Sequence, residues 1–247
     1  MPTGKADETA TPVYRRVLLK LSGEALMGDR DYGLDPVTVE RIATEVKAVS
    51  ELGVEICLVI GGGNIFRGVT IAKAVGNRVA GDQMGMLATV MNAIALQQKL
   101  DAGGVASRLF SAVAMPQICE TFNQRAAQAA FDAGEVTIFA GGLGHPYLTT
   151  DTTAAMRGAE MGCDAIFKGT QVDGVYSADP KTDKTATRFD RLSHDEVLAR
   201  DLKVMDTAAI ALARDNGIPV IVFSIQQPGA FLDILRGEGR ATVVADG

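Results

Sequence analysis

The sequence predicts an α/β protein, a three-layer sandwich in which helices cover both faces of a mainly parallel central sheet. Short apolar runs recur along the chain, as in strands that are covered on both faces. Segments with helical spacing separate most of these runs, which is the alternation typical of a parallel sheet. With 247 residues, 47% of them hydrophobic, the chain is long enough to form a substantial core.

The elements can be placed in order along the chain. Residues 16–21 are the first expected strand, because the three residues after Arg16 are all apolar. A helix follows from Pro36, and its apolar residues recur with helical spacing until Gly53 ends it in the usual C-terminal position. We expect further strands at residues 55–60, 108–113, 136–140, 165–168 and 219–224, a short edge strand at 242–245 and a loop at 179–191.

A long helix is expected from Asp82 to about Leu100. Apolar side chains occur all around it, so that little polar face remains. Such a helix either lies at the centre of the core or packs on another subunit. The pattern favours a subunit contact.

Composition and charge exclude several classes of protein. A net charge of −6 argues against a general nucleic-acid surface. The three cysteines are scattered and lack CxxC spacing, so we interpret them as small buried apolar residues of a reduced cytoplasmic protein. With two histidines, a histidine-rich metal site is excluded. Residues 1–12 are interpreted as a flexible tail before one domain at 13–247, and neither a signal peptide nor a membrane span is expected.

Residues 141–152, GGLGHPYLTTDT, are the most informative segment of the chain. A glycine-rich turn between a strand and a helix leaves backbone N–H groups free to bind an anion, and the positive end of the helix adds to the attraction. Thr149 and Thr150 add hydroxyls, and Asp151 adds a carboxylate. These features predict a phosphate-binding corner, while capping of the following helix explains Asp151 equally well.

Other strand ends and helix starts carry related features. Lys20 stands near the end of the first strand, where it could neutralise a phosphoryl group or simply extend into solvent. Three glycines and Arg67 follow the second strand, and they predict either a second phosphate-binding turn or a tight turn with a surface arginine. Lys168 is positioned for phosphate at the end of a later strand. Asp82 and Asp206 precede helices, so capping and a role in the site are both open.

The common nucleotide-binding and hydrolase signatures are absent from the sequence. There is no GxxxxGK[ST] segment, and the HRD, DFG and APE motifs of protein kinases are missing. Tyr147 stands where a dinucleotide-binding turn would have its third glycine. No Gx[SC]xG elbow indicates a hydrolase.

Taken together, seven segments resemble the amino-acid-kinase superfamily, and within it the bacterial uridylate kinases. They occur in the order of the family, and the resemblance runs from about residue 13 to the C-terminus. The segments at 82–92 and 202–206 separate the uridylate branch from relatives that act on acetylglutamate or aspartate. The matching segments are residues 17–26 (VLLKLSGEAL), 59–68 (VIGGGNIFRG), 77–79 (NRV), 82–92 (DQMGMLATVMN), 144–151 (GHPYLTTD), 172–180 (VDGVYSADP) and 202–206 (LKVMD).

The resemblance implies a carbamate-kinase-like fold and transfer of the γ-phosphoryl group of ATP to UMP, with Mg²⁺ bound to ATP and no residue assigned as a metal ligand. It further implies a homohexamer, feedback inhibition by UTP and activation by GTP, with residues 28–33 at the place of the family's activator loop. Neither a nucleic acid nor a membrane is implied as a partner. The UMP side comprises roughly residues 13–165, and the ATP side roughly residues 166–247.

The resemblance also assigns individual site residues. The catalytic group is Lys20, Arg67, Asp151 and Asp206. The ATP-binding group is Lys20, Leu21, Ser22, Gly23, Gly63, Arg67, Lys168, Thr170, Tyr176 and Asp179. The UMP-binding group is Gly62, Asp82, Leu143, Gly144, His145, Pro146, Tyr147, Leu148, Thr149 and Thr150.

Two other functions remain to be distinguished from this one. A related kinase with a carboxylate acceptor would phosphorylate acetylglutamate, aspartate or glutamate and not UMP. A uridine-nucleotide sensor would bind UMP or UTP without consuming ATP. The presence of Lys20, Arg67 and Asp151 argues against the sensor.

Overall fold

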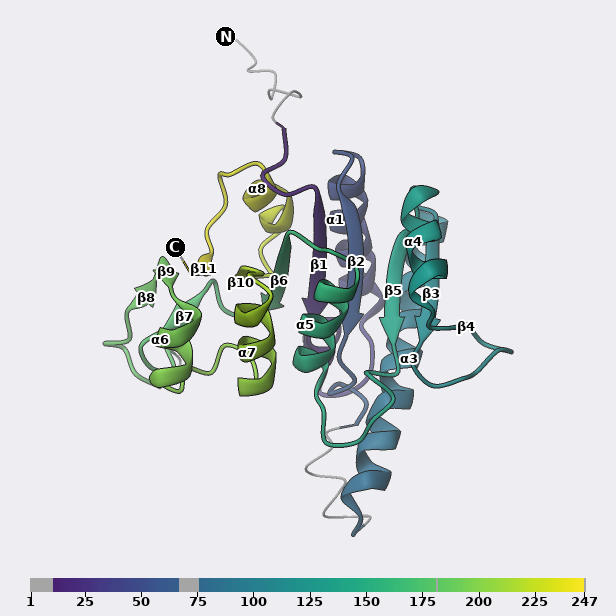
Figure 1. Cartoon of the computed structure of the whole chain (residues 1–247), viewed down its shortest axis with the longest axis horizontal. Coiled ribbons are helices and arrows are strands. Elements are labelled where there is room, and N and C mark those ends of the chain that lie inside the picture. Colours follow the sequence, from purple (N-terminus) through teal and green to yellow (C-terminus); the bar gives the residue numbers. More distant parts are fainter. Residues whose placement is uncertain (1–10, 67–75, 181, 247) are drawn as a thin grey trace.

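The computed structural model describes residues 11–66, 76–180 and 182–246. The largest sheet of this part of the chain has nine strands in the order β4-β3-β5-β2-β1-β6-β10-β11-β9 (Figure 1). All neighbours in it are parallel except β10 and β11. The strands are β1 Arg16–Leu21, β2 Glu55–Ile60, β3 Ser107–Ser111, β4 Glu120–Thr121, β5 Val136–Ala140, β6 Ala165–Thr170, β9 Arg191–Leu192, β10 Val220–Ser224 and β11 Thr242–Val244. A separate antiparallel pair joins β7 (Val175–Tyr176) to β8 (Arg188–Phe189).

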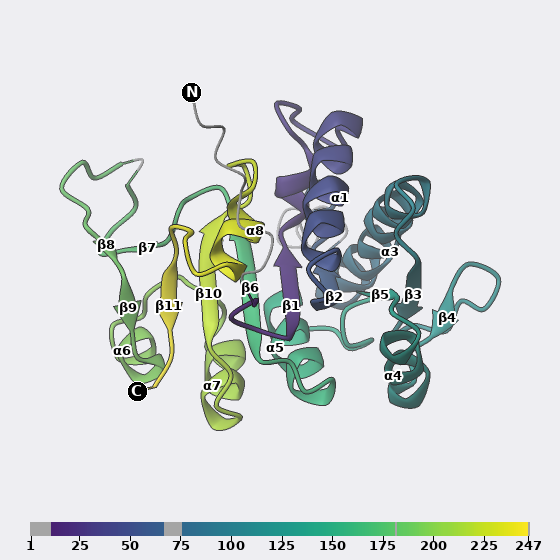
Figure 2. The ribbon, with the colours of Figure 1, turned by 90° about the horizontal axis from the view of Figure 1, so that it is seen from above.

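Helices cover both faces of the sheet, which confirms the three-layer sandwich. Figure 2 shows one helix layer above the sheet and a second below it. The first layer contains α1 (Pro36–Ser50), α3 (Arg78–Ala102) and α8 (Ala230–Leu235). The second contains α4 (Gln124–Asp132), α5 (Thr150–Glu160), α6 (His194–Ala199) and α7 (Thr207–Asp215), and the short 3-10 helix η1 (Gly23–Leu26) follows β1.

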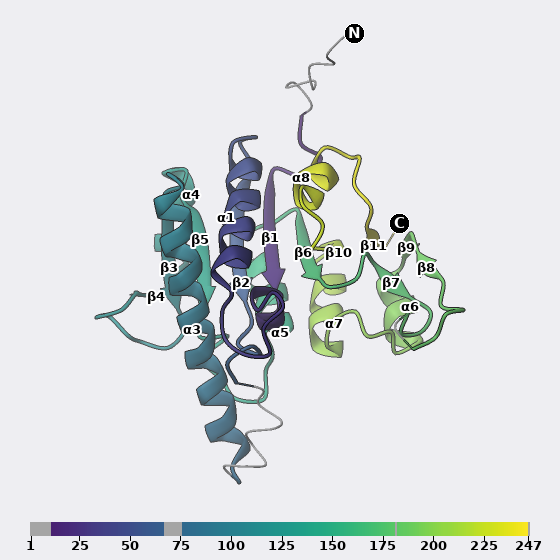
Figure 3. The ribbon, with the colours of Figure 1, turned by 180° about the vertical axis from the view of Figure 1, so that it is seen from behind.

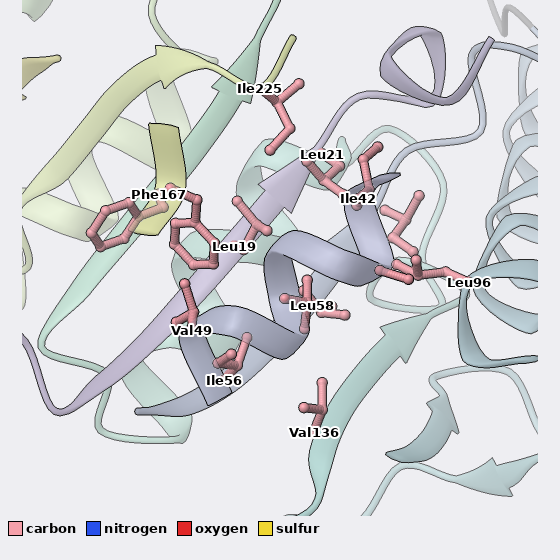
Figure 4. Close-up of a cluster of buried hydrophobic side chains, with 14 of the residues drawn as sticks. Leu19, Leu21, Ile42, Val49, Ile56, Leu58, Leu96, Val136, Phe167 and Ile225 are labelled. Carbon is pink, nitrogen blue, oxygen red and sulfur yellow. The ribbon is translucent and has the colours of Figure 1, made fainter. Parts of the chain in front are cut away.

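The core explains why the strands are apolar on both faces. In β1, Leu19 and Leu21 pack in a cluster with residues of α1, α3 and α8, whereas Leu18 packs in a second cluster with residues of α5 and α7. Figure 4 shows the first cluster, where Leu19 and Leu58 lie beneath α1. Strands β1, β2, β3, β5, β6 and β10 contribute side chains to both cores in this way, as the continuous apolar runs predict.

The structure corrects several expected boundaries. The strand expected at 108–113 is β3, Ser107–Ser111, and the strand expected at 165–168 continues to Thr170. Residues 242–245 are not an edge strand, because β9 pairs with β11 on its outer side. The expected loop at 179–191 contains β8 and the first residue of β9. The tail expected at residues 1–12 lies almost wholly outside the described residues.

The long helix α3 begins one turn earlier than predicted. The Asn77 side chain caps it by accepting hydrogen bonds from the N–H groups of Val79 and Ala80, so Asp82 does not open the helix. Figures 1 and 3 show that the first turns of α3 extend beyond the carboxyl ends of the strands. On its outer side Leu87 is 51% exposed and Met91 is 55% exposed, one turn apart.

The cysteines follow the expectation only in part. Cys57 and Cys163 are buried, and their sulfur atoms lie 3.7 Å apart. Cys119 is only partly buried, so it is not a core residue of the same kind. All three are free thiols. None of the helices that the structure describes is both long enough and apolar enough to cross a membrane.

Candidate active site

Two lysines from neighbouring strands meet at the carboxyl edge of the sheet. Strands β1 and β6 are parallel neighbours, and their register places Lys20 directly beside Lys168. Their side chains are only 7% and 16% exposed. Two ammonium groups in such a place require a partner, because burial of unpaired charge is costly.

Asp151 of α5 is that partner. Its Oδ1 lies 2.6 Å from Nζ of Lys20, and its Oδ2 lies 3.0 Å from Nζ of Lys168. The capping explanation of Asp151 is wrong, because Thr149 is the N-cap and its side chain accepts a hydrogen bond from the Asp151 N–H at 3.0 Å. With the cap supplied by Thr149, the carboxylate is free to bridge the lysines.

The two lysines and Asp151 carry one net positive charge. Burial alone would raise the pKa of Asp151, but the charges of Lys20 and Lys168 and their hydrogen bonds lower it overall. Burial lowers the pKa of Lys168, and Asp151 offsets this only in part. An anion placed here would neutralise the remaining charge, which makes this group suitable for holding a phosphate.

The titration of Asp151 yields a prediction about acid stability. Its pKa in the folded protein is below the unfolded value of 3.8, so its contribution to the free energy of unfolding is fully present above pH 3.8. That contribution is lost as the pH falls through the folded-state pKa. We expect the difference in unfolding free energy between the wild type and Asp151→Asn to be constant from about pH 5 to 8 and to shrink below pH 3.8. Urea unfolding at successively lower pH measures this, and a difference that persists unchanged to about pH 2 contradicts it.

Asp206 does cap its helix, as one of the two interpretations held. Its Oδ1 accepts a hydrogen bond from the Ala209 N–H at 2.8 Å at the start of α7. Its Oδ2 accepts from the Thr152 hydroxyl at 2.8 Å and also from the Thr149 hydroxyl. Asp206 therefore joins the start of α7 to the start of α5, close to the Asp151 carboxylate.

A cavity of about 190 Å³ is lined in part by Thr149 and Thr150, which precede Asp151. The first turns of α3, the glycine turn after β2 and the loop after β5 form its walls. Of the residues expected to bind UMP, Gly144, Pro146 and Tyr147 lie in the same loop without lining the cavity. The lining residues are Gly62, Gly63, Phe66, Arg78, Gly81, Asp82, Gly85, Met86, Thr89, Gly142, Leu143, His145, Leu148, Thr149 and Thr150.

Asp82 is fixed at the wall of this cavity by two other residues. Its carboxylate accepts hydrogen bonds from Nε of Arg78 at 2.8 Å and from the Tyr147 N–H at 2.8 Å. The Arg78 guanidinium also lies over the Tyr147 ring, 5.4 Å from its centroid. Tyr147 has a φ of 68°, which is unusual for a residue other than glycine. The loop after β5 is therefore held against α3 by a polar contact that involves a strained residue.

A second, larger cavity has a volume of about 540 Å³. It is lined by Thr170, Tyr176 and Asp179, three of the residues expected on the ATP side. The Tyr176 hydroxyl donates a hydrogen bond to Asp173 at 2.6 Å, which raises the pKa of Tyr176. Val204 also lines this cavity, and its carbonyl oxygen accepts a hydrogen bond from Lys168. Lys168 is thus hydrogen-bonded to the wall of the larger cavity.

Of the other expected ATP-binding residues, Gly63 follows β2 and lines the smaller cavity, and three lie where β1 ends. Leu21 is fully buried in the core, so only its backbone is available for a ligand. Ser22 is the N-cap of η1 without a side-chain capping bond. A Cβ atom on Gly23 would lie 2.6 Å from the Gly63 N, so glycine is required for the β1 and β2 turns to approach each other. Arg67 lies outside the described residues.

Several residues of the site were not expected from the sequence. Arg78, Thr89, Thr152 and Val204 line the cavities or hold Asp82, Asp206 and Lys168. Arg78, Thr89 and Val204 lie in segments that carry the resemblance, and Thr152 follows directly after one, which was the available signal. In the described ranges, no group of three or more His, Cys, Asp or Glu side chains is arranged to hold a metal ion.

Comparisons with known proteins agree with this geometry. The model of the amino acid kinase family matches residues 15–224. The uridylate kinase of Mesorhizobium japonicum is 61% identical over 238 residues, which is 96% of this chain and 99% of that protein. The uridylate kinase of Paramagnetospirillum magneticum is 59% identical over 233 residues, 94% of this chain and 97% of that protein.

Solved structures show the same similarity. UMP kinase from Bacillus anthracis superposes with a TM-score of 0.91 at 38% identity, covering 94% of this chain and 96% of that one. UMP kinase from Ureaplasma parvum gives a TM-score of 0.89 at 34% identity, with 94% and 99% covered. The parallel sheet and its positively charged edge thus define a phosphoryl-transfer enzyme. The chain belongs to the amino acid kinase family, in the branch of the bacterial uridylate kinases.

Proposed function

We propose that this enzyme transfers the γ-phosphoryl group of ATP to UMP, giving UDP and ADP, in pyrimidine nucleotide synthesis. The observation that carries the proposal is the group of Lys20, Asp151 and Lys168, which carries one net positive charge. Thr150, next to Asp151, lines the smaller cavity, and Val204, which accepts a hydrogen bond from Lys168, lines the larger one. The smaller cavity suits the monophosphate and the larger one suits ATP. The similarity to uridylate kinases over nearly the full length supports UMP as the acceptor.

The reaction depends on positioning and on charge neutralisation. A phosphate oxygen of UMP is already nucleophilic at neutral pH, so no strong general base is needed. The Lys20 ammonium stabilises the negative charge on the phosphoryl group during transfer. Asp151 orients Lys20 and Lys168, and Asp206 holds the Thr149 hydroxyl at the edge of the acceptor cavity. Arg67 is proposed to draw the two phosphate groups together against their repulsion.

Mg²⁺ is proposed to enter with ATP. Magnesium in kinases is bound through one or two carboxylates together with substrate phosphates and water. Asp151 and Asp206 are two carboxylates of this edge, and the described contacts already engage both with lysine or threonine groups. This donor set fits an ion held chiefly by the ATP phosphates, where it would neutralise phosphate charge.

A coupled assay for ADP release tests the function. Mg-ATP is supplied with UMP, CMP, dUMP or acetylglutamate as the acceptor. Turnover with UMP is expected. Turnover with acetylglutamate alone would show that UMP is the wrong acceptor, while the assignment to the kinase family would stand. Binding of UTP without turnover of any acceptor would favour a sensor.

We propose that the enzyme is a homohexamer in which the outer side of α3 forms a subunit contact. Leu87 and Met91 are exposed apolar residues one turn apart, as in helices that pack on a neighbour. The double substitution Leu87→Glu and Met91→Glu is expected to dissociate the assembly, because each would place a charge in an apolar interface. Sedimentation velocity measures this, with Val37→Glu on α1 as a control, since Val37 is an exposed apolar residue of another helix. A double variant with the mass of the wild type contradicts the proposal.

Regulation and location are proposed on the family resemblance. UTP is expected to inhibit, because it carries the uracil of the acceptor, and GTP is expected to activate with residues 28–33 involved. Initial rates with each nucleotide added separately test both. The three free thiols fit a reducing compartment such as the cytoplasm.

A further inference from the structure

Two glycine turns that follow neighbouring strands both line the acceptor cavity. Gly62 and Gly63 follow β2, and Gly142 follows β5. Since β2 and β5 are parallel neighbours, both turns leave the same edge of the sheet. The distance between them decides where a phosphate between them would lie.

Asn92 of α3 holds the first of these turns. It is fully buried, and its Nδ2 donates hydrogen bonds to the Gly61 carbonyl at 2.7 Å and to Oδ1 of Asn64 at 2.7 Å. Its Oδ1 accepts from Nδ2 of Asn64 at 3.0 Å. Both hydrogens of the Asn92 amide are thus used to bind the β2 turn.

Thr89, one turn earlier on α3, holds the second. Its hydroxyl accepts a hydrogen bond from the Gly141 N–H at 2.8 Å and donates to the Met86 carbonyl at 2.6 Å. The single hydroxyl hydrogen is therefore already used, so Thr89 has no donor left for a ligand. Its effect on a substrate must pass through Gly141.

The β2 turn also packs directly on α3. A Cβ atom on Gly62 would lie 2.8 Å from the Gly85 carbonyl oxygen and 2.9 Å from the Ala88 Cβ. This close approach leaves the turn no room to move toward the helix. One face of α3 therefore fixes both turns, through direct packing and through two buried polar side chains.

We infer that Thr89 and Asn92 are positioning residues for the acceptor nucleotide, setting the separation of the two glycine turns and so the place of the UMP phosphate relative to Lys20. The inference deepens the proposed function and rests on it. Misplacement of reacting groups by about 1 Å can cost about 100-fold in rate. A loss of either hydrogen bond should therefore affect UMP more than ATP, which occupies the other cavity.

Thr89→Val tests this with little change in side-chain volume, and Thr89→Ser restores the hydroxyl. The valine variant is expected to raise KM for UMP, or lower kcat, by about tenfold, with KM for ATP within about twofold of the wild type. UMP binding in equilibrium dialysis is expected to weaken in parallel. The serine variant should be close to the wild type. Gln97→Leu is the matched control, since Gln97 donates from the same helix to the Ser107 carbonyl at 3.3 Å.

Each outcome decides the inference. Wild-type KM, kcat and UMP binding in Thr89→Val would overturn it. Equal losses in the valine, serine and control variants, together with equal losses of Tm, would also overturn it, because they indicate general stability alone. If the valine variant does not fold, Thr89→Ala is measured by the same criteria. Absence of UMP turnover in the wild type would instead refute the proposed function itself.

Discussion

Replacing Lys20 with alanine is expected to lower the turnover number for UMP phosphorylation by at least ~100-fold, the effect of losing one preorganised electrostatic partner. The Lys20 ammonium is buried and held 2.6 Å from Asp151, so it needs no reorganisation when the phosphoryl group becomes charged. Water entering the vacated space is a poor substitute, because its dipoles must first reorient. Steady-state kinetics with saturating ATP and UMP measure the change.

Lys47→Ala is a suitable control for that variant. Lys47 lies on α1 with a side chain that is 43% exposed, and its ion-pair partner Glu51 is also exposed. Its removal is expected to leave turnover within about twofold, as is usual for surface charges. Near-normal turnover in Lys20→Ala would remove Lys20 from the mechanism.

Asp151→Asn is expected to reduce both activity and stability. The substitution leaves two buried ammonium groups beside each other without a counter-charge, and breaking a buried pair in this way costs about 3–5 kcal/mol of unfolding free energy. The lysines also lose the carboxylate that orients them, so turnover should fall by at least ~100-fold. Urea unfolding at pH 7 and steady-state kinetics are the two measurements.

A surface pair supplies the matched comparison. Oδ1 of Asp195 lies 2.9 Å from a guanidinium nitrogen of Arg214, and the Asp195 side chain is 75% exposed. Asp195→Asn should change the unfolding free energy by no more than about 1 kcal/mol. Equal unfolding free energies for Asp151→Asn and Asp195→Asn would show that the buried ion pairs of Asp151 contribute no more to stability than a surface pair.

The strands of the central sheet could be predicted because burial on both faces leaves a direct mark in the sequence. Strands β1, β2 and β5 begin and end at the expected residues. The two-residue strands β4, β7, β8 and β9 could not be predicted, since their pairing depends on partners far along the chain and not on local apolar runs. The early start of α3 follows from Asn77, a capping signal that the apolar pattern obscured.

Some contacts of the site could not be predicted either, because they join residues far apart in the sequence. A sequence with Thr149 and Asp151 two positions apart permits either residue to cap α5, and only the lysines of β1 and β6 decide which does. Thr89 and Asn92 lie within a segment that carries the family resemblance, yet their hydrogen bonds are to backbone groups of the turns after β2 and β5. Such contacts form only in the folded protein, so the local sequence does not predict them.

The charge imbalance among Lys20, Asp151 and Lys168 has a consequence for the stability of the enzyme. Without a bound ligand, two cations share one carboxylate. This group therefore stabilises the edge of the sheet less than one lysine paired with one carboxylate would. A ligand that binds only the folded state stabilises it in proportion to the logarithm of its concentration. We therefore expect resistance to heat and proteolysis to rise with the concentration of a nucleotide that binds at this edge.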